Sequence, residues 1–227
     1  MKFKNPIFKN EWKERKKGEM RSIIPDVLGW IEYKLDDQEM DYVWRCINAK
    51  STKRFNERLA GHVTGSYELK DRSDWFLLNT LRKLLDKYSQ NFKNLGDETA
   101  NNQKHPYKIA NWWVNYQKQG EFNPFHNHYG VYSFVIWMKI PVDWHEQNQI
   151  PFARESNSKT VSCFEFVYKD ILGKDVTYDY RLSSKDEGVM LLFPSKMSHV
   201  VYPFYNCDED RVSVSGNIEI NTAKSFR

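Results

Sequence analysis

The segment FNPFHNHYG, residues 122–130, carries the side chains of this chain that are best suited to bind a metal ion. The chain has only six histidines, yet His126 and His128 stand two positions apart beside an apolar run. Successive side chains of a β-strand point to opposite faces, so an extended segment places both imidazoles on one face and Asn127 on the other. Two imidazoles that point the same way are the beginning of a chelate.

A third histidine and an arginine follow much later in the sequence. His199 lies in LLFPSKMSHVVYPF, just after an apolar strand that ends at Phe193. Twelve residues further on, Arg211 opens the strand RVSVSGNIEI. Four polar side chains share one face of that strand: Arg211, Ser213, Ser215 and Asn217. Such a face is either exposed to solvent or lines a cavity, and the alternation of the strand does not decide between the two.

In this order the residues resemble the motif of the Fe(II)- and 2-oxoglutarate-dependent oxygenases of the prolyl-hydroxylase-like type, which are common in bacteria and phages. That motif is His-x-Asp/Glu, a distal His, and an Arg followed by x-Ser. Here GEFNPFHNH matches the first part, FPSKMSH the second and RVS the third. The resemblance covers about residues 107–220 and so leaves the first hundred residues to other roles.

The resemblance implies a hydroxylase built on a double-stranded β-helix, a cupin-like jelly roll whose open end holds the metal. By motif position, His126 and His199 would bind Fe(II), and Arg211 with help from Ser213 would bind the distal carboxylate of the cosubstrate 2-oxoglutarate. Tyr116 stands ten residues before His126, where related hydroxylases often carry a cosubstrate-binding tyrosine. Imidazole suits Fe(II), and a guanidinium fork matches a carboxylate. No catalytic side chain is expected beyond this metal centre, where dioxygen reacts.

Position 128 departs from the family pattern, because the usual carboxylate is replaced by His128. Two histidines and one carboxylate leave three coordination positions open on the metal, and three imidazoles can leave the same number. The charge differs, since losing the carboxylate makes the metal site one unit more positive. We expect His128 to be the third ligand. The alternative is that it swings aside and leaves a water or an anion in its place.

Two other functions remain open at this point. A cupin-like metalloenzyme could use the three histidines without a 2-oxo acid, in which case Arg211 would not matter for a cosubstrate. A catalytically silent jelly roll could bind protein or nucleic acid through the start of the chain, where the first 22 residues hold eight basic and three acidic side chains. The letters HNH do not indicate a nuclease, because the apolar run YSFVIWM follows where that family has a helix.

The primary substrate is not identified by the sequence. Prolyl side chains, other peptidyl residues, small metabolites and nucleic-acid bases are all compatible with the family. Substrate choice lies in loops that have no readable code. One such loop is the polar segment 143–159, which we expect to leave the strands and cover the mouth of the site.

The elements that must position these residues divide the chain into two parts. Apolar periodicity predicts helices over residues 36–49 and 73–92, and the polar stretch 94–106 indicates a linker. From Tyr107 onward, short β-type runs follow one another at the spacing of a sandwich or jelly roll. We therefore expect an α+β, mainly β protein. Residues 1–106 would form an arm and supporting helices packed on a catalytic core over 107–227, within one structural domain.

Cysteine usage and hydropathy indicate the compartment. The three cysteines show no CxxC spacing, which argues against both a disulfide framework and a zinc ribbon. The longest apolar stretch, VYSFVIWM, is far shorter than the ~18 residues that a membrane span needs. The lysine-rich start lacks the apolar region of a signal peptide. These features predict a soluble cytoplasmic protein without disulfides and without a membrane partner.

Overall fold

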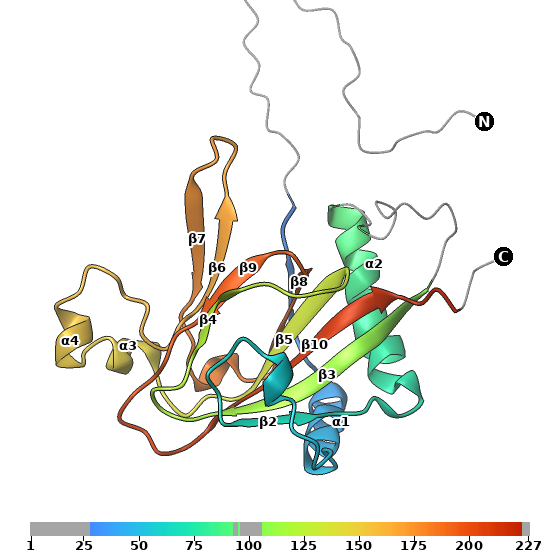
Figure 1. The fold of residues 1–227 in the computed structure, drawn as a ribbon, viewed down its shortest axis with the longest axis horizontal. Helices are drawn as coiled ribbons and strands as arrows, with labels where there is room; N and C mark the ends of the chain where they lie inside the picture. The colour runs from blue at the N-terminus through green and yellow to red at the C-terminus, as the bar shows by residue number, and fades with distance from the viewer. Residues whose placement is uncertain (1–27, 93–94, 96–105, 224–227) are drawn as a thin grey trace, which may run out of the picture.

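The computed structural model of the protein describes residues 28–92, 95 and 106–223. The basic start of the chain lies outside the described residues, as does most of the segment 94–106 that we interpreted as a linker. In the described part of the chain, two antiparallel sheets carry the core and helices cover one of them (Figure 1). This mainly β architecture with few helices confirms the fold class expected from the sequence.

The larger sheet has six strands, and strands from both halves of the chain build it. Their order is β1-β8-β5-β10-β3-β2. The bounds are β1 Ile31–Lys34, β8 Val189–Pro194, β5 Tyr132–Lys139, β10 Arg211–Ile220, β3 Tyr107–Gln117 and β2 Gly65–Glu68. The four inner strands coincide with apolar runs of the sequence. The two edge strands, β1 and β2, were missed because each has only four residues, too few for a periodic pattern to stand out.

The smaller sheet has four strands in the order β4-β9-β6-β7. They are β4 Asn123–His126, β9 Ser198–Val201, β6 Phe164–Lys169 and β7 Asp175–Tyr180. Apolar side chains of both sheets form a common cluster between them: Val135, Trp137, Leu191 and Phe193 from the larger sheet, and Phe164 and Phe166 from the smaller one. Two sheets packed in this way are the jelly roll that the resemblance implied.

Both predicted helices are present. Helix α1, Asp37–Asn48, starts at a capping box in which Asp36 and Glu39 each accept a hydrogen bond from the backbone of the other. The second helical run begins at Trp75, contains a π-helical turn over Leu77–Leu81 and continues as α2, Arg82–Asn91. The predicted start at residue 73 is two residues early because Ser73 and Asp74 have positive φ angles of 57° and 53°.

These helices pack on the outer face of the larger sheet (Figure 1). Val43 and Ile47 of α1, together with Leu84 and Tyr88 of α2, are buried in one cluster with alternate side chains of the sheet. The sheet contributes residues of even number, including Trp112 and Val114 of β3 and Val212 and Val214 of β10. Odd-numbered residues therefore point between the sheets in β3 from Asn111 onward and in β10 as far as Asn217, where a register shift occurs.

Short helices and turns complete the described chain. The segment 143–159 contains α3, Trp144–Gln147, and α4, Pro151–Arg154, which lie on the opposite side of the molecule from α1 and α2 (Figure 1). Single 3₁₀ turns are η1 Asn56–Arg58, η2 Arg72–Asp74 and η5 Ser184–Asp186. Cys46, Cys163 and Cys207 are free. In the described part of the chain, no helix combines the length and the apolar character that crossing a membrane requires.

Candidate metal centre

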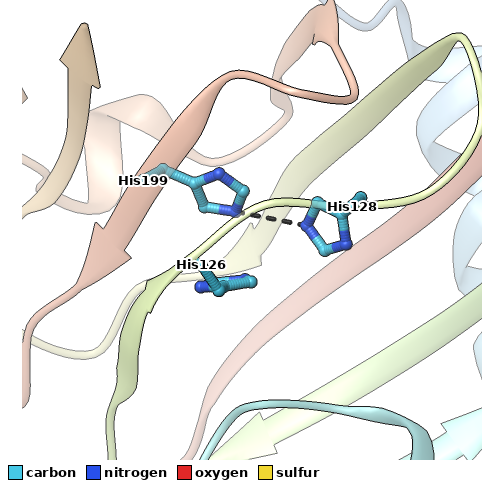
Figure 2. Close-up of side chains that lie close together, drawn as sticks. All are labelled: His126, His128 and His199. Atoms are coloured by element: carbon cyan, nitrogen blue, oxygen red, sulfur yellow. Dashed lines mark hydrogen bonds between the residues drawn. The ribbon is translucent and has the colours of Figure 1, made fainter.

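The three singled-out histidines meet on the smaller sheet (Figure 2). Strands β4 and β9 pair antiparallel, with His126 directly opposite His199. His128 lies two residues beyond His126, where β4 has ended, and its backbone N–H donates to the carbonyl oxygen of Ser195 at 2.8 Å. Figure 2 shows the three side chains pointing toward one another, two from the segment of β4 and one from β9. The sheet pairing thus joins His126 and His199, which lie 73 positions apart.

The spacing of the ring nitrogens fits a shared cation. One ligand atom from each of the three rings lies within 4.8 Å of the other two. The Nε2 atoms of His128 and His199 are 3.2 Å apart. Donors bound at right angles to a metal at about 2.1 Å are separated by roughly 3 Å. The pair is therefore already close to the spacing of two neighbouring ligands.

Backbone carbonyls fix the orientation of two of the rings. Nδ1 of His126 lies 2.6 Å from the carbonyl oxygen of Pro124, and Nδ1 of His199 lies 3.2 Å from that of Met197. A carbonyl oxygen can only accept, so each Nδ1 carries the proton and donates. The lone pair is then on Nε2, which is free to bind a metal. Such a hydrogen bond to the second ring nitrogen accompanies most metal-bound histidines.

Burial keeps the three imidazoles neutral. His199 is only 4% exposed and is surrounded by the rings of Phe164, Phe166 and Phe193 at 5.2, 6.1 and 5.3 Å between centroids. Loss of solvent lowers the pKa of His199 well below its ordinary value and lowers that of His128 to about 3. The same cause lowers the pKa of His126. At neutral pH all three rings therefore offer lone pairs.

A cavity of about 480 Å³ connects these histidines with Arg211. The odd-numbered side chains of two neighbouring strands of the larger sheet line it: Asn111, Trp113, Asn115 and Gln117 of β3, and Arg211, Ser213, Ser215 and Asn217 of β10. The polar face of the last strand, which the sequence left between solvent and a cavity, thus lines the cavity. Apolar rings from the facing sheet, including Phe164, complete the wall.

Arg211 is a buried cation without a carboxylate partner among the described residues. It is 2% exposed. Its Nε and Nη2 donate to the side-chain oxygen of Gln117 at 3.1 and 2.8 Å, and Nη1 donates to the carbonyl oxygen of Ser162 at 2.8 Å. Nη2 also donates to the carbonyl oxygen of Tyr202 at 3.0 Å. Four of its five N–H groups are used, all on neutral acceptors.

The charge of Arg211 persists despite its burial. Loss of solvent lowers the pKa of its guanidinium to about 10, which still leaves the group protonated at neutral pH. Neutral oxygens satisfy its hydrogen bonds but do not cancel its charge. A carboxylate that enters the cavity meets this uncompensated charge and one remaining N–H. The chemistry of this end of the cavity thus fits an organic anion.

Of the other predicted site residues, Ser213 lies in the cavity and Tyr116 does not. Tyr116 is adjacent to Gln117 in β3 and therefore points to the opposite face, where it packs with the helical layer and lies 6.1 Å from the ring of Tyr67. The side chain of Tyr116 therefore does not face the cavity. Gln117, which was not predicted, takes the position beside Arg211. Alternation along β3 was the signal that could have identified it.

The mouth of the cavity is formed by a different segment from the one expected. No residue of 143–159 lines the cavity, because that segment is tied elsewhere through reciprocal hydrogen bonds of 2.8 Å between the Gln147 side chain and the backbone of Tyr205. Residues of the segment 55–63 line it instead, among them Phe55, Arg58 and Gly61. No pattern in the sequence predicts the role of this segment, since its position depends on contacts with β3 and β4.

The region that holds most of this cavity is similar to a family of known proteins. Residues 111–217 match the family model described as "Putative 2OG-Fe(II) oxygenase". The matched range includes His126, His128, His199, Arg211 and Ser213. This segment, 107 of the 227 residues, is similar to the 2OG-Fe(II) oxygenases. The match identifies an oxidoreductase of the class that uses Fe(II) as cofactor with 2-oxoglutarate and dioxygen as cosubstrates.

One solved oxygenase structure shares the fold at a TM-score of 0.50, and two others are similar at lower scores. A Pseudomonas putida prolyl-4-hydroxylase is 15% identical over 86% of this chain and 94% of its own, with a TM-score of 0.50. A 2OG-Fe(II) oxygenase-family oxidoreductase from Burkholderia pseudomallei is 13% identical over 88% and 89%, with a TM-score of 0.48. A viral collagen prolyl hydroxylase from Paramecium Bursaria Chlorella virus-1 is 11% identical over 83% and 94%, with a TM-score of 0.44. No curated protein sequence is significantly similar to the chain.

Proposed function

We propose that this protein is a hydroxylase in which His126, His128 and His199 hold Fe(II) and Arg211, assisted by Ser213, binds the distal carboxylate of 2-oxoglutarate. One observation carries the proposal. A single cavity contains three converging neutral imidazoles and, elsewhere in its wall, a buried guanidinium that lacks an anionic partner among the described residues. A cation and a dianionic chelator together complement these two groups.

The histidines supply three neutral donors from one side. Strand pairing fixes two of them and the Ser195 contact fixes the third, so little reorganisation is needed on binding. Three imidazoles leave three of six coordination positions open, which is the number that a bidentate 2-oxo acid and dioxygen require. When bound, Fe(II) would supply the chemistry by which dioxygen converts 2-oxoglutarate to succinate and carbon dioxide, with one oxygen atom entering succinate and the other a C–H bond of the substrate.

His128 makes the binding of metal and cosubstrate depend on each other more strongly than a carboxylate would. No anion from the protein offsets the charge of the metal, because all three donors are neutral. The 2-oxo acid is then the first anion to reach the metal. We therefore expect 2-oxoglutarate to raise the affinity for Fe(II), and Fe(II) to raise the affinity for 2-oxoglutarate by the same factor.

Arg211 holds the cosubstrate, and the cavity wall keeps water away. The Gln117 amide oxygen and two backbone carbonyls fix the guanidinium, so it does not have to be ordered when the carboxylate arrives. Trp137, Phe164 and Phe193 line the cavity beside the histidines. Their apolar surface strengthens the electrostatic attraction between Arg211 and a carboxylate by lowering the local dielectric constant.

Anaerobic titration tests the proposal. Addition of Fe(II) and then 2-oxoglutarate should produce a weak visible charge-transfer band, and exposure to air should yield succinate. Arg211→Gln should abolish the band while Fe(II) still binds, since the histidines are unchanged. Absence of both band and succinate in the unaltered protein would contradict the proposal. A band that persists in Arg211→Gln would point instead to a three-histidine metalloenzyme in which this arginine has no cosubstrate role.

Peptidyl residues are the first substrate class to assay. The Pseudomonas putida protein with this fold is a prolyl-4-hydroxylase. Near the histidines, the rings of Phe125 and Tyr129 are 60% and 83% exposed, and Tyr129 lines the cavity. Peptides containing proline, incubated with Fe(II), 2-oxoglutarate and air, should gain 16 mass units if this class is correct. Succinate formation without a change in peptide mass would exclude those peptides as substrates.

A further inference from the structure

The charges around the cavity all have one sign. Two formally charged side chains line it among the described residues, and both are arginines, Arg58 and Arg211. No described aspartate or glutamate contributes to the wall. The proposed ligands of the metal are neutral, so the two charges of 2-oxoglutarate only offset those of Fe(II). Both guanidinium charges therefore remain when metal and cosubstrate are bound.

Arg58 lies at the opening of the cavity and has no ion-pair partner among the described residues. It ends the 3₁₀ turn η1, is exposed, and lies with its Cζ atom 5.7 Å from the centre of the Phe55 ring. The turn belongs to the segment 55–63, which precedes the region shared with the oxygenase family. Because the segment lies outside the matched region, it is a place where substrate choice can differ between relatives.

Contacts with the metal-binding sheet hold this segment in place. The Phe55 ring is stacked on Trp113 with a centroid distance of 4.8 Å and an interplanar angle of 13°. The backbone N–H of His62 donates to the carbonyl oxygen of Phe122 at 2.8 Å, and the two rings are stacked at 4.8 Å. Gly61 packs so closely on Asn123 that a Cβ atom would lie 1.7 Å from its Oδ1. Arg58 is thus carried by a fixed turn beside β4.

We propose that the primary substrate carries an anionic group, a carboxylate or a phosphate, and that Arg58 binds this group at the cavity mouth. The inference rests on the proposed function, because it concerns the substrate of the same site. Phe55 and Trp113 line the cavity beside the guanidinium, and at 4% and 3% exposure they mainly fix the turn that carries it. Arg58 is then a specificity-determining residue. A cationic substrate finds no acidic partner in the described wall.

The test uses small probes on protein loaded with Zn(II) and saturated with 2-oxoglutarate, which prevents turnover and blocks Arg211. Phenylacetate and phenyl phosphate are compared with neutral phenylacetamide by ligand-observed NMR. One charge-assisted contact should make at least one anion bind about tenfold tighter than the amide. The relative affinity of the two anions shows whether a carboxylate or a phosphate is preferred.

Two variants and a matched control assign the effect to Arg58. Arg58→Gln should bring anions and amide to similar affinities, and Arg58→Glu should reverse the preference toward phenethylammonium. Arg154→Gln removes another exposed arginine, paired at 3.9 Å with Glu155 on the segment that does not line the cavity, and should leave the anion preference intact. Equal binding of anions and amide by the unaltered protein would overturn the inference, as would an Arg58→Gln variant that behaves like the control.

Binding of 2-oxoglutarate is measured first on the same samples. Its absence would contradict the proposed function through Arg211. Normal binding of 2-oxoglutarate, combined with no preference for anionic probes, would contradict only the role of Arg58.

Discussion

Burial has opposite consequences at the histidine cluster and at Arg211, although both line one cavity. Loss of solvent lowers the pKa of His126, His128 and His199, which removes their protons and turns them into neutral donors for a cation. The same loss lowers the pKa of Arg211 only to about 10, so that group keeps its charge and attracts an anion. One physical effect thus prepares two different binding groups because their unperturbed pKa values differ.

The two groups also differ in how they are supported. The histidines are fixed by the pairing of β4 with β9 and by contacts to residues near in sequence, such as Pro124 and Met197. Arg211 is fixed by Gln117, Ser162 and Tyr202, which come from three separate regions of the chain. Substitutions at the two places should therefore separate metal binding from cosubstrate binding.

The largest effect is expected from removing the most buried histidine. His199→Ala should weaken Fe(II) or Ni(II) binding by more than about 100-fold, because changes that only disturb the support of a ligand already cost 10–100-fold. Anaerobic calorimetric titration gives the affinity. His145→Ala, an exposed histidine on α3 outside the cavity, is the control and should bind metal normally.

The same titration decides the role of His128. His128→Ala should weaken metal binding by a similar factor if this residue is the third donor. A variant that binds metal as tightly as the unaltered protein would show that His128 swings aside. Normal metal binding by His199→Ala would contradict the histidine site as a whole.

Arg211→Gln should weaken the binding of 2-oxoglutarate and leave the binding of the metal unchanged. Loss of one partner from a buried charge pair costs about 2–5 kcal/mol, so 2-oxoglutarate should bind at least about 30-fold more weakly to metal-loaded protein. Metal affinity without 2-oxoglutarate should stay within about twofold, because the histidine ligands are not altered. Thermal melting checks that the variant folds. Arg211→Lys, which keeps the charge but loses the fork, serves as a second variant and should recover only part of the affinity.

Gln117→Glu should weaken cosubstrate binding without removing the arginine. The new carboxylate would replace the amide oxygen that accepts from Nε and Nη2 of Arg211, and it would neutralise the guanidinium from within the protein. We expect 2-oxoglutarate affinity to fall by about tenfold, with metal affinity unchanged, in the same calorimetric experiment. Unchanged affinity for 2-oxoglutarate would mean that the charge of Arg211 is not what binds it.

A smaller effect is expected on the pH dependence of the metal-free protein. The pKa values of the three histidines are lowered in the folded state, so below about 6.5 the unfolded chain binds protons that the folded chain does not. The contribution of the three histidines to the free energy of unfolding should be fully present above that pH. It should fall as the pH drops toward their pKa values in the folded state, by at most about 1.4 kcal/mol per pH unit for each histidine.

Urea denaturation between pH 7.5 and 5 measures this slope. His128→Asn should reduce the slope, because its pKa is lowered to about 3. Equal slopes for His128→Asn and the unaltered protein would contradict the burial of His128 as the cause.

Local patterns predicted much of the fold and the placement of the candidate histidines. Alternation identified the strands that carry His126 and Arg211, and apolar periodicity identified both helices. The jelly roll was implied by the resemblance to the oxygenase family, which rests on the order of the motif residues. These features depend on residues that are close in sequence or on a motif with fixed order, which a single sequence can display.

Features that depend on tertiary contacts were not predictable. Strands β1 and β2 exist because β8 and β3 offer open edges, and the segment 55–63 takes its place through stacking on Trp113 and pairing with Phe122. Tyr116 was chosen by its distance from the motif, and the alternation of β3 turns it away from the cavity. The expected cover, 143–159, is held elsewhere by Gln147.

The central claim is that one molecule of 2-oxoglutarate spans the two groups, with its 2-oxo acid end at the histidines and its distal carboxylate at Arg211. Paramagnetic broadening of ¹³C signals from labelled 2-oxoglutarate tests it directly on protein loaded with Co(II), which binds to the same kinds of donor. We predict the strongest broadening at C1 and C2, weaker broadening at C5, and loss of the bound signal in Arg211→Gln. Equal broadening of all carbons, or the same pattern in Arg211→Gln, would contradict this arrangement.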